Sequence, residues 1–378
     1  MKNAVIAGYV RSPFTPAHKG EMTDIRPDEI AAQVVKALVE RTGVKATDIE
    51  DLIMGCAFPE GEQGLNVSRL VSFIAGLPIS VAGQTVNRFC GSSMQSVHIA
   101  AANIAAGMGD VFIAAGMESM TRVPMTGFNP LPHPELYERY PEAYESMGVT
   151  AENLANKYNI KRKVQEQFAV DSHKKAYKAA ESGKFNDEII NIVYGGKTVS
   201  KDGCIRPETT VEKLEELRPA FDSKGTVTAG TSSPLTDGAV ALLICSEEYA
   251  GKNGLKAIAR IKSFAVSGCA PEIMGIGPVN ATKKALQRAG LELKDIDIIE
   301  LNEAFAAQAI AVIKELNIDT EKLNLDGGAI ALGHPLGASG GRIVGKAAGL
   351  LKRKKGKYAL ATMCIGGGQG IATILEAI

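Results

Sequence analysis

The distribution of hydrophobic residues along the chain predicts alternating strands and helices. Residues 4–10 and, apart from Arg260, residues 258–261 are runs of apolar and β-branched side chains, which are typical of central strands covered on both faces. Residues 93–106 are small and apolar on nearly every side, as in a buried helix. Strands that alternate with helical stretches indicate an α/β fold built in layers.

The pattern occurs twice along the chain. Gly43 and Gly290 each follow a Lys-Ala-Leu helix end and precede an apolar strand, and they lie 247 residues apart. The apolar strands predicted at 111–115 and 358–362 share this offset. We therefore expect two halves of like topology: residues 1–119, completed by about residues 236–257, and residues 258–378.

The segment between the halves, residues 120–235, has a different character. Residues 125–141 are crowded with proline, glycine and histidine and predict irregular chain, whereas residues 151–158 and 162–182 predict polar helices. We expect an inserted loop domain. It is either a structural lid or dimer element, or a cap over a substrate.

Composition excludes several classes of function. The 42 basic residues balance the 42 acidic ones, which leaves no excess charge for binding nucleic acid or a membrane surface. No apolar run approaches the roughly 20 residues that cross a bilayer, and the first residues enter a strand pattern without a cleavable leader. Six cysteines without a Cys-x-x-Cys pair or zinc-ligand spacing predict free thiols and no metal. We expect a cytoplasmic protein.

Cys90 is the first candidate for chemistry. It follows an apolar strand and stands at the start of the buried helix, where the helix dipole favours a thiolate. The 247-residue offset sets it opposite Gly337 in the second half. The alternative is an inert buried cysteine, because free cysteine is among the most buried residue types.

His334 lies in a glycine-rich stretch, residues 324–341, which we interpret as a strand-to-helix turn. The glycines let the backbone approach a ligand closely, and a histidine in such a turn favours acid–base chemistry over a place in the core. A phosphate-binding loop is the alternative, but neither the dinucleotide fingerprint nor the P-loop lysine pattern is present.

Two further segments follow predicted strands. Cys364 leaves an apolar strand into three glycines, whose exposed N–H groups are suited to stabilise an oxyanion, or which simply form a hairpin turn. Asn302 is either a helix cap or an amide that orients a water or an imidazole. Because all four segments stand at comparable strand ends of the two halves, we expect them to meet at one site.

Together these segments resemble the thiolase family over essentially the whole chain. The blocks that carry the resemblance occur in the family's order: Asn87-Arg88-Phe89-Cys90, Gly116-Met117-Glu118-Ser119-Met120, Asn302-Glu303-Ala304-Phe305, Gly333-His334-Pro335 and Cys364-Ile365-Gly366-Gly367-Gly368-Gln369-Gly370. The resemblance implies a duplicated, layered αβαβα fold. It also implies an acyltransferase that acts on coenzyme A thioesters.

The resemblance assigns a role to each candidate. Cys90 is expected to carry the acyl group, His334 to activate it, and Cys364 to exchange the proton at the α-carbon of the second substrate. Asn302 is expected to hold a water that forms one oxyanion site with His334, and the N–H groups of Cys90 and Gly366 to form the other. A thiolate is both a good nucleophile and a good leaving group, so transfer between Cys90 and coenzyme A is reversible.

Coenzyme A is then a substrate, and no cofactor is expected. By resemblance, Met147 bounds the acyl pocket and the segment 226–238 lines the pantetheine channel. Arg206 is suited to the nucleotide end, although a solvated loop arginine explains it equally well. The expected binding residues are Met147, Arg206, Ala229, Gly230, Ser233, Ala304 and Phe305.

Two positions bear on the substrate. The acetoacetyl-forming branch of the family usually carries histidine and asparagine where this chain has Ser146 and Thr231, so the chain is more similar to degradative 3-ketoacyl-CoA thiolases. The alternatives are a short-chain acetyl-CoA acetyltransferase and an inactive lipid-binding homologue. A ketoacyl synthase would lack a second catalytic cysteine such as Cys364. The resemblance implies a homodimer or homotetramer that binds neither nucleic acid nor membrane.

Overall fold

The apolar runs form strands that pair into one large sheet in the computed structural model, which describes residues 2–378. The strands are β1 (Ala4–Arg11), β2 (Thr15–Pro16), β3 (Asp51–Gly55), β4 (Ala82–Val86), β5 (Val111–Ser119), β6 (Ile192–Tyr194), β7 (Lys197–Val199), β8 (Thr236–Ser246), β9 (Ala259–Gly268), β10 (Ile298–Leu301), β11 (Tyr358–Ile365) and β12 (Gln369–Ala377). Within the described residues the sheet runs β10-β11-β12-β9-β1-β8-β5-β3-β4, β2 pairs with β8, and β6 and β7 form a separate pair.

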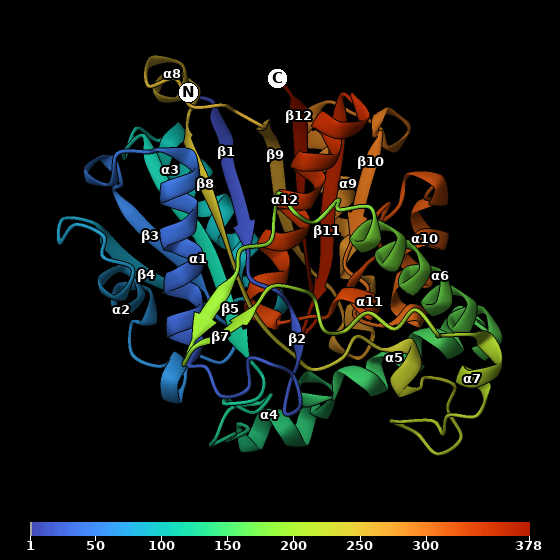
Figure 1. Ribbon diagram of the computed structural model, residues 1–378. Helices are drawn as coiled ribbons and strands as arrows, with labels where there is room; N and C mark the ends of the chain where they lie inside the picture. The colour runs from blue at the N-terminus through green and yellow to red at the C-terminus, as the bar shows by residue number, and fades with distance from the viewer. Residues whose placement is uncertain (1) are drawn as a thin grey trace.

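The helices cover the outer face of each half of this sheet and also lie between the two halves. They are α1 (Pro27–Thr42), α2 (Val67–Ile74), α3 (Ser92–Ala105), α4 (Pro134–Arg139), α5 (Met147–Lys157), α6 (Arg162–Glu181), α7 (Val211–Glu215), α8 (Glu247–Lys252), α9 (Gly277–Ala289), α10 (Ala306–Leu316), α11 (Ala329–Leu332) and α12 (Leu336–Lys354). Figure 1 shows the N-terminal half at the left and the C-terminal half at the right.

The sheet consists of two halves with the same topology. The order β1-β8-β5-β3 in one half corresponds to β9-β12-β11-β10 in the other, and β1 and β9 join the halves as an antiparallel pair. The helices before β3 and β10 both end at a left-handed glycine, Gly43 with φ 68° and Gly290 with φ 67°. Glycine adopts this conformation without strain. The predicted duplicated α/β fold is confirmed.

Five layers result from this duplication. In the central layer, α3 and α12 share one buried cluster with strands of both halves. The helices α1 and α2 cover the outer face of the first half, and α9 and α10 cover that of the second. Along β8, Val240 and Leu242 face the central layer whereas Ala241 and Leu243 face the outer one. This two-sided burial explains why β8 is apolar without interruption from Ala239 to Cys245.

Glycines allow the two central helices to approach closely where they begin. A Cβ atom on Gly340 of α12 would lie 2.6 Å from the backbone nitrogen of Met94 in α3. The N–H of Gly341 donates to Ser93 Oγ at 2.7 Å. The starts of α3 and α12 are thereby fixed against each other.

The inserted segment packs on the second half at one end of the sheet. Leu154 of α5 and Val170 of α6 share a buried cluster with Ile310 of α10. The helix α6 is predicted nearly correctly, whereas α5 begins at Met147, earlier than the predicted residue 151. The three-part division of the chain into domains stays a prediction. Among residues 2–378, no helix is long and apolar enough to cross a membrane.

Candidate active site

Cys90 lies in a 3₁₀ turn, Phe89–Gly91, between β4 and α3. The preceding Phe89 has a φ of 41°, which is rare for an aromatic residue and often marks a functional turn. Its N–H donates to Asn87 Oδ1 at 2.8 Å. Burial raises the pKa of the Cys90 thiol to about 11, and hydrogen bonds from the N–H groups of Gly366 and Cys90 act in the opposite direction. Burial therefore outweighs the expected effect of the helix N-terminus, and the resting thiol is protonated at neutral pH.

Cys364 lies near the end of β11, against the turn that carries Cys90. A Cβ atom on Gly91 would lie 2.6 Å from Ile365 Cδ1, so the Cys90 turn sits directly on the end of this strand. Burial raises the pKa of the Cys364 thiol well above its usual range, and charge on Cys90 raises it further. A thiolate on one sulfur thus disfavours a thiolate on the other. The chain after Cys364 also forms the hairpin turn into β12 that was the alternative expectation.

Asn302 and His334 form a second pair. Asn302 Nδ2 lies 3.3 Å from His334 Nε2, and both side chains are buried. Asn302 does not cap a helix, because α10 begins at Ala306 with Phe305 as its N-cap. Asn302 Oδ1 has no hydrogen-bond partner among the described residues. A buried amide oxygen of this kind is suited to accept a hydrogen bond from a water or a substrate.

Ser339 determines which nitrogen of His334 carries the proton. Ser339 Oγ donates to Pro335 O at 2.9 Å, and it lies 2.5 Å from His334 Nδ1. Because its hydrogen is used, Ser339 accepts from Nδ1–H, which leaves Nε2 unprotonated and facing Asn302. Burial lowers the pKa of His334 to about 3, so the imidazole is neutral. His334 follows the short helix α11, not a strand, and the predicted strand-to-helix turn is therefore wrong.

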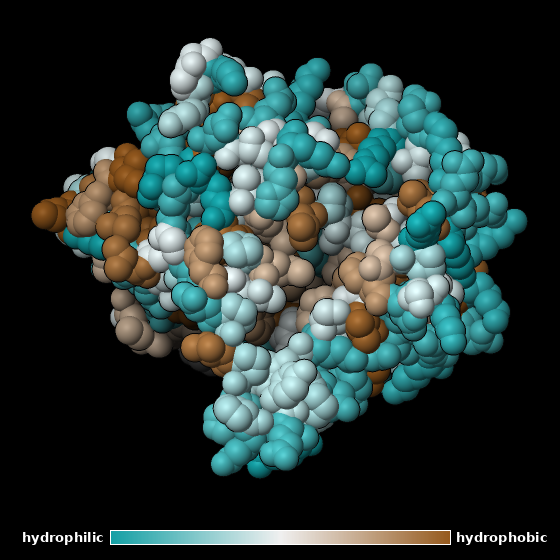
Figure 2. Space-filling view, turned by 90° about the horizontal axis from the view of Figure 1, so that it is seen from below, coloured by the Kyte–Doolittle hydropathy of each residue, from teal (hydrophilic) through white to brown (hydrophobic). Residues whose placement is uncertain are grey.

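The pair Cys90 and Cys364 and the pair Asn302 and His334 lie at the same end of the sheet, where its parallel strands have their C-terminal ends. The strands β10 and β11 run parallel with Leu301 opposite Thr362, and the N–H of Asn302 donates to Thr362 O at 3.1 Å. Asn302 and Cys364 therefore lie at the C-terminal ends of two neighbouring strands, at the end of the sheet where α3 and α12 begin. Figure 2 views the molecule from this side, and the surface is hollowed near its middle.

The expected binding residues form two groups around this end of the sheet. Met147, Ala304 and Phe305 share a buried apolar cluster with Cys364. Arg206, Ala229 and Gly230 line a small hollow together with His173 and Cys204. The N–H of Ser233 donates to Ala304 O at 2.9 Å and joins the two groups.

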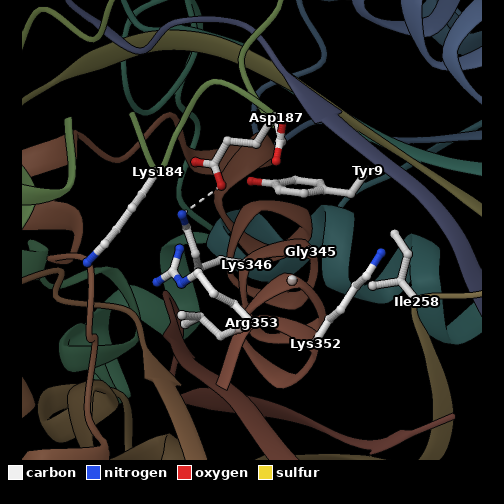
Figure 3. A pocket seen from close by; sticks show the side chains of 11 residues that line it. Tyr9, Lys184, Asp187, Ile258, Gly345, Lys346, Lys352 and Arg353 are labelled. Atoms are coloured by element: carbon white, nitrogen blue, oxygen red, sulfur yellow. Dashed lines mark ion pairs between the residues drawn. The ribbon is translucent and has the colours of Figure 1, made fainter. Parts of the chain in front are cut away.

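A cavity of about 500 Å³ elsewhere in the molecule is larger but has a structural explanation. Figure 3 shows its basic lining, in which Lys346 reaches a carboxylate. Lys346 Nζ lies 2.7 Å from Glu188 Oε2, and Arg353 Nη2 lies 2.5 Å from Asp326 Oδ2. Because carboxylates neutralise these cations and no thiol or imidazole lines the cavity, we assign the chemistry to the end of the sheet where Cys90 lies.

Sequence analysis assigns no role to Ser339 or Glu118. Ser339 stands in the first turn of the helix that follows His334-Pro335, and this spacing is a usable signal. Glu118 is a carboxylate in the apolar strand β5, whose nine residues are all buried. A charged side chain buried in such a strand must be compensated by hydrogen bonds, which indicates that the residue has a specific role. Among residues 2–378, no group of three or more His, Cys, Asp or Glu side chains is arranged to hold a metal ion.

Comparison with known proteins gives the same picture along the whole chain. The model of the thiolase N-terminal domain matches residues 4–248, and that of the thiolase C-terminal domain matches residues 255–377. The 3-ketoacyl-CoA thiolase of Bacillus subtilis is 48% identical, with 100% of both chains covered. That of Marinomonas sp. is 50% identical over 100% of this chain and 98% of its own.

Two solved structures share the fold. The Bacillus anthracis acetyl-CoA acetyltransferase has a TM-score of 0.92 at 40% identity, and human mitochondrial 3-ketoacyl-CoA thiolase has a TM-score of 0.92 at 38% identity. Each alignment covers 100% of this chain and 99% of the other. With both domain models matched in order and relatives of full length, the protein belongs to the thiolase family.

Proposed function

We propose that the protein is a 3-ketoacyl-CoA thiolase, which cleaves a 3-ketoacyl-CoA with coenzyme A into acetyl-CoA and a shortened acyl-CoA. The observation that carries this proposal is that the Cys90 turn packs on the end of β11 that holds Cys364, where Gly91 meets Ile365, while the buried pair Asn302 and His334 lies at the same end of the sheet. The full-length relatives named 3-ketoacyl-CoA thiolase support the choice of substrate.

The first half-reaction forms an acyl-enzyme. His334 Nε2 takes the proton of the Cys90 thiol as the sulfur bonds to the C3 carbonyl carbon of the substrate. The C2–C3 bond then breaks, its electron pair stays on C2 as the enolate of acetyl-CoA, and Cys364 supplies the proton that completes acetyl-CoA. Because burial keeps both Cys90 and His334 neutral at rest, this proton moves only as the new carbon–sulfur bond forms.

The second half-reaction releases the acyl group. Cys364, a thiolate after the first half-reaction, takes the proton of the coenzyme A thiol, whose sulfur attacks the Cys90 thioester. One thioester replaces another, and the sulfur of Cys90 leaves and recovers its proton from His334. The N–H groups of Cys90 and Gly366 lower the pKa of the Cys90 thiol and are suited to stabilise the oxyanion on the acyl carbon. Asn302 and His334 would stabilise the negative charge on the enolate oxygen. Each preorganised donor of this type is typically worth about 3 kcal/mol.

Coenzyme A is the proposed partner of the two groups of binding residues, and no resident cofactor takes part. Met147, Ala304 and Phe305 lie beside Cys364 and are suited to the acyl and thioester end. Arg206, Ala229 and Gly230 line the neighbouring hollow and are suited to the pantetheine and phosphate end.

Intact mass measurement tests the assignment of the two cysteines. After incubation with acetyl-CoA, the wild-type protein should gain one acetyl group, and Cys90→Ser should gain none. Cys364→Ala should still gain the acetyl group but should neither condense nor cleave substrate. Acetylation that survives in Cys90→Ser would overturn the proposal.

The substrate range has a second candidate, because a solved structure that matches with a TM-score of 0.92 is an acetyl-CoA acetyltransferase. The relatives and the residues Ser146 and Thr231 favour longer 3-ketoacyl chains. We expect kcat/KM to be higher for 3-ketooctanoyl-CoA than for acetoacetyl-CoA. A strong preference for the four-carbon thioester would make the acetyltransferase the correct assignment.

We further propose a homo-oligomer assembled through the edge of the first half. The strand β4 ends the sheet, and the neighbouring chain exposes large apolar side chains, namely Leu65, Phe73, Ile74 and Ile79. Phe73 and Ile74 end α2, and Leu65 and Ile79 stand in the chain before and after it. Figure 1 shows α2 and β4 at the left, and Figure 2 shows hydrophobic surface gathered at the same side. An uncovered strand edge beside an apolar patch favours pairing with a second copy. Light scattering should give at least a dimer, and Ile79→Asp should weaken it.

A cytoplasmic location is also proposed. All six cysteines, at positions 56, 90, 204, 245, 269 and 364, are free in the described structure. Free thiols at this number are typical of a reducing compartment. Cell fractionation with the tagged protein tests this, and recovery from an exported fraction would contradict it.

A further inference from the structure

Glu118 is a buried carboxylate near the end of β5 whose hydrogen bonds reach both halves of the protein. It is 2% exposed. Its oxygens accept hydrogen bonds from the N–H of Ala57 at 2.8 Å, from Gln63 Nε2 at 2.7 Å and from the N–H of Gly337 at 2.9 Å. The N–H of Phe58 adds a longer bond at 3.3 Å. Burial of a carboxylate is unfavourable unless such donors compensate it.

These donors connect the turn of His334 to the half that carries Cys90. Ala57 follows β3 in the first half, whereas Gly337 is in the first turn of α12, three residues after His334. Burial raises the pKa of Glu118, and the four N–H donors named above act in the opposite direction because they suit an ionised acceptor. A negative charge at the start of a helix is also favourable. The carboxylate therefore holds the start of α12 to the first half.

The duplication of the fold shows that this contact is specific to one half. The 247-residue offset relates Glu118 to Ile365 and Gly337 to Cys90. Ile365 packs under the turn of Cys90, where it meets Gly91. The end of β11 thus supports the start of α3 by an apolar contact, and the end of β5 supports the start of α12 by charge-assisted hydrogen bonds.

We propose that Glu118 is a positioning residue, which fixes the His334 turn relative to Cys90. This inference rests on the proposed function. The geometry has an electrostatic consequence that provides a second observable, because the charge of Glu118 raises the pKa of the Cys90 thiol. The residue thus improves the position of the base while it makes the thiol harder to ionise.

Two substitutions separate these effects. Glu118→Gln keeps the shape but removes the charge and turns an NH₂ group toward N–H donors. Glu118→Asp keeps the charge but is one methylene too short to reach both Ala57 and Gly337. Both variants should lower kcat for thiolysis by roughly 10- to 100-fold, as expected for the loss of a charge-assisted hydrogen bond, with KM changed less than about threefold.

The pH dependence of Cys90 alkylation by iodoacetamide, followed by peptide mass, is the second readout. Its midpoint should move to lower pH in Glu118→Gln and stay at the wild-type value in Glu118→Asp. The matched control is Glu188→Gln. Glu188 is also a buried carboxylate that links the first half to α12, through Arg11 and Lys346, but it lies in the cavity of Figure 3.

Glu188→Gln should lower the melting temperature without changing kcat or the alkylation midpoint. If Glu118→Gln folds and keeps wild-type kcat, or if both variants lose activity only as far as the control does, Glu118 is not a positioning residue. If Glu118→Gln fails to fold, Glu118→Asp decides by its kcat. A wild-type protein that forms no acetyl-enzyme contradicts the proposed function instead, and the alkylation midpoints then still report on Glu118.

Discussion

His334 Nδ1 lies 2.5 Å from Ser339 Oγ, whose hydrogen is directed to Pro335 O. The serine therefore keeps the proton of the imidazole on Nδ1 and leaves Nε2 unprotonated, as its proposed role as the base requires. Loss of this contact would let the proton occupy either nitrogen and would free the ring to rotate. A fraction of the enzyme would then carry a proton on Nε2, which could no longer accept one from Cys90 in the proposed mechanism.

Ser339→Ala should lower kcat about tenfold, the effect of one buried hydrogen bond, and leave KM nearly unchanged. Steady-state thiolysis measures both constants. Ser96→Ala is the matched control, because Ser96 Oγ makes the same bond to a carbonyl four residues earlier, at 3.2 Å to Ser92 O, in the other central helix. Equal losses in the two variants would show that Ser339 acts on the helix and not on His334.

Asn302→Asp tests the neutrality of the imidazole. Burial lowers the pKa of His334 to about 3, and a carboxylate in place of the amide would raise it, because the imidazolium would be paired. A protonated His334 cannot accept the proton of Cys90. We expect kcat to fall by roughly 10²- to 10³-fold and the acidic limb of its pH profile to move to higher pH.

Asn302→Ala is the comparison for that experiment. It removes the donor without adding charge, so its kcat should fall while the acidic limb stays where it is in the wild type. An acidic limb that moves equally in both variants would contradict the electrostatic explanation.

Much of the fold and part of the site follow from local sequence. Strands such as β8 are apolar over most of their length because both of their faces are covered, and the 247-residue offset places equivalent strands in the two halves. Cys90 after β4 and Cys364 at the end of β11 are where the strand patterns place them. These features depend on a few consecutive residues, which is the range over which hydrophobic periodicity is informative.

The parts that could not be predicted depend on distant residues. The partners of Glu118 stand at positions 57, 63 and 337, and no spacing in the sequence indicates that they meet. The upward shift of the Cys90 pKa likewise reflects burial by both halves, which the helix start alone does not reveal. The short helix α11 before His334 was missed because Gly327, Gly328 and Gly333 on either side of it suggest a turn.

Two glycines of α12 should respond to substitution in opposite directions. A Cβ atom on Gly340 would lie 2.6 Å from Met94 N, whereas one on Gly349 would meet nothing within 4 Å. Gly340→Ala should therefore destabilise the fold by about 1–3 kcal/mol through overpacking. Gly349→Ala should stabilise it by about 0.5–1 kcal/mol, because alanine restricts the unfolded chain and favours the helix.

Urea unfolding at constant pH measures both changes in the free energy of unfolding. Each variant serves as the control for the other, since the same substitution is made in the same helix. Gly340→Ala should also lower kcat, because it separates the starts of α3 and α12. If Gly340→Ala were neutral, the close approach of the two central helices would not limit the fold.

His98 should make the protein less stable in acid. It is buried in α3, stacks on Phe264 with ring centroids 4.6 Å apart, and its Nε2 lies 2.8 Å from Thr373 Oγ1 of β12. Burial lowers its pKa to about 3, whereas an unfolded histidine has a pKa near 6.5. Between these values the unfolded state binds more protons, so stability is full above about pH 6.5 and falls as the pH drops toward 3.

His98→Gln removes this contribution, which amounts to at most about 1.4 kcal/mol for each pH unit. The variant should be less stable than the wild type at pH 7.5, because it disturbs the contact between α3 and β12, but its stability should fall less steeply between pH 6.5 and 4. Urea unfolding across this range measures the slope. His173 and His334, with pKa values lowered to about 4 and about 3, act in the same direction and remain in the variant. The slope should therefore decrease without vanishing, and an unchanged slope in His98→Gln would mean that His98 becomes protonated in the folded protein at little cost.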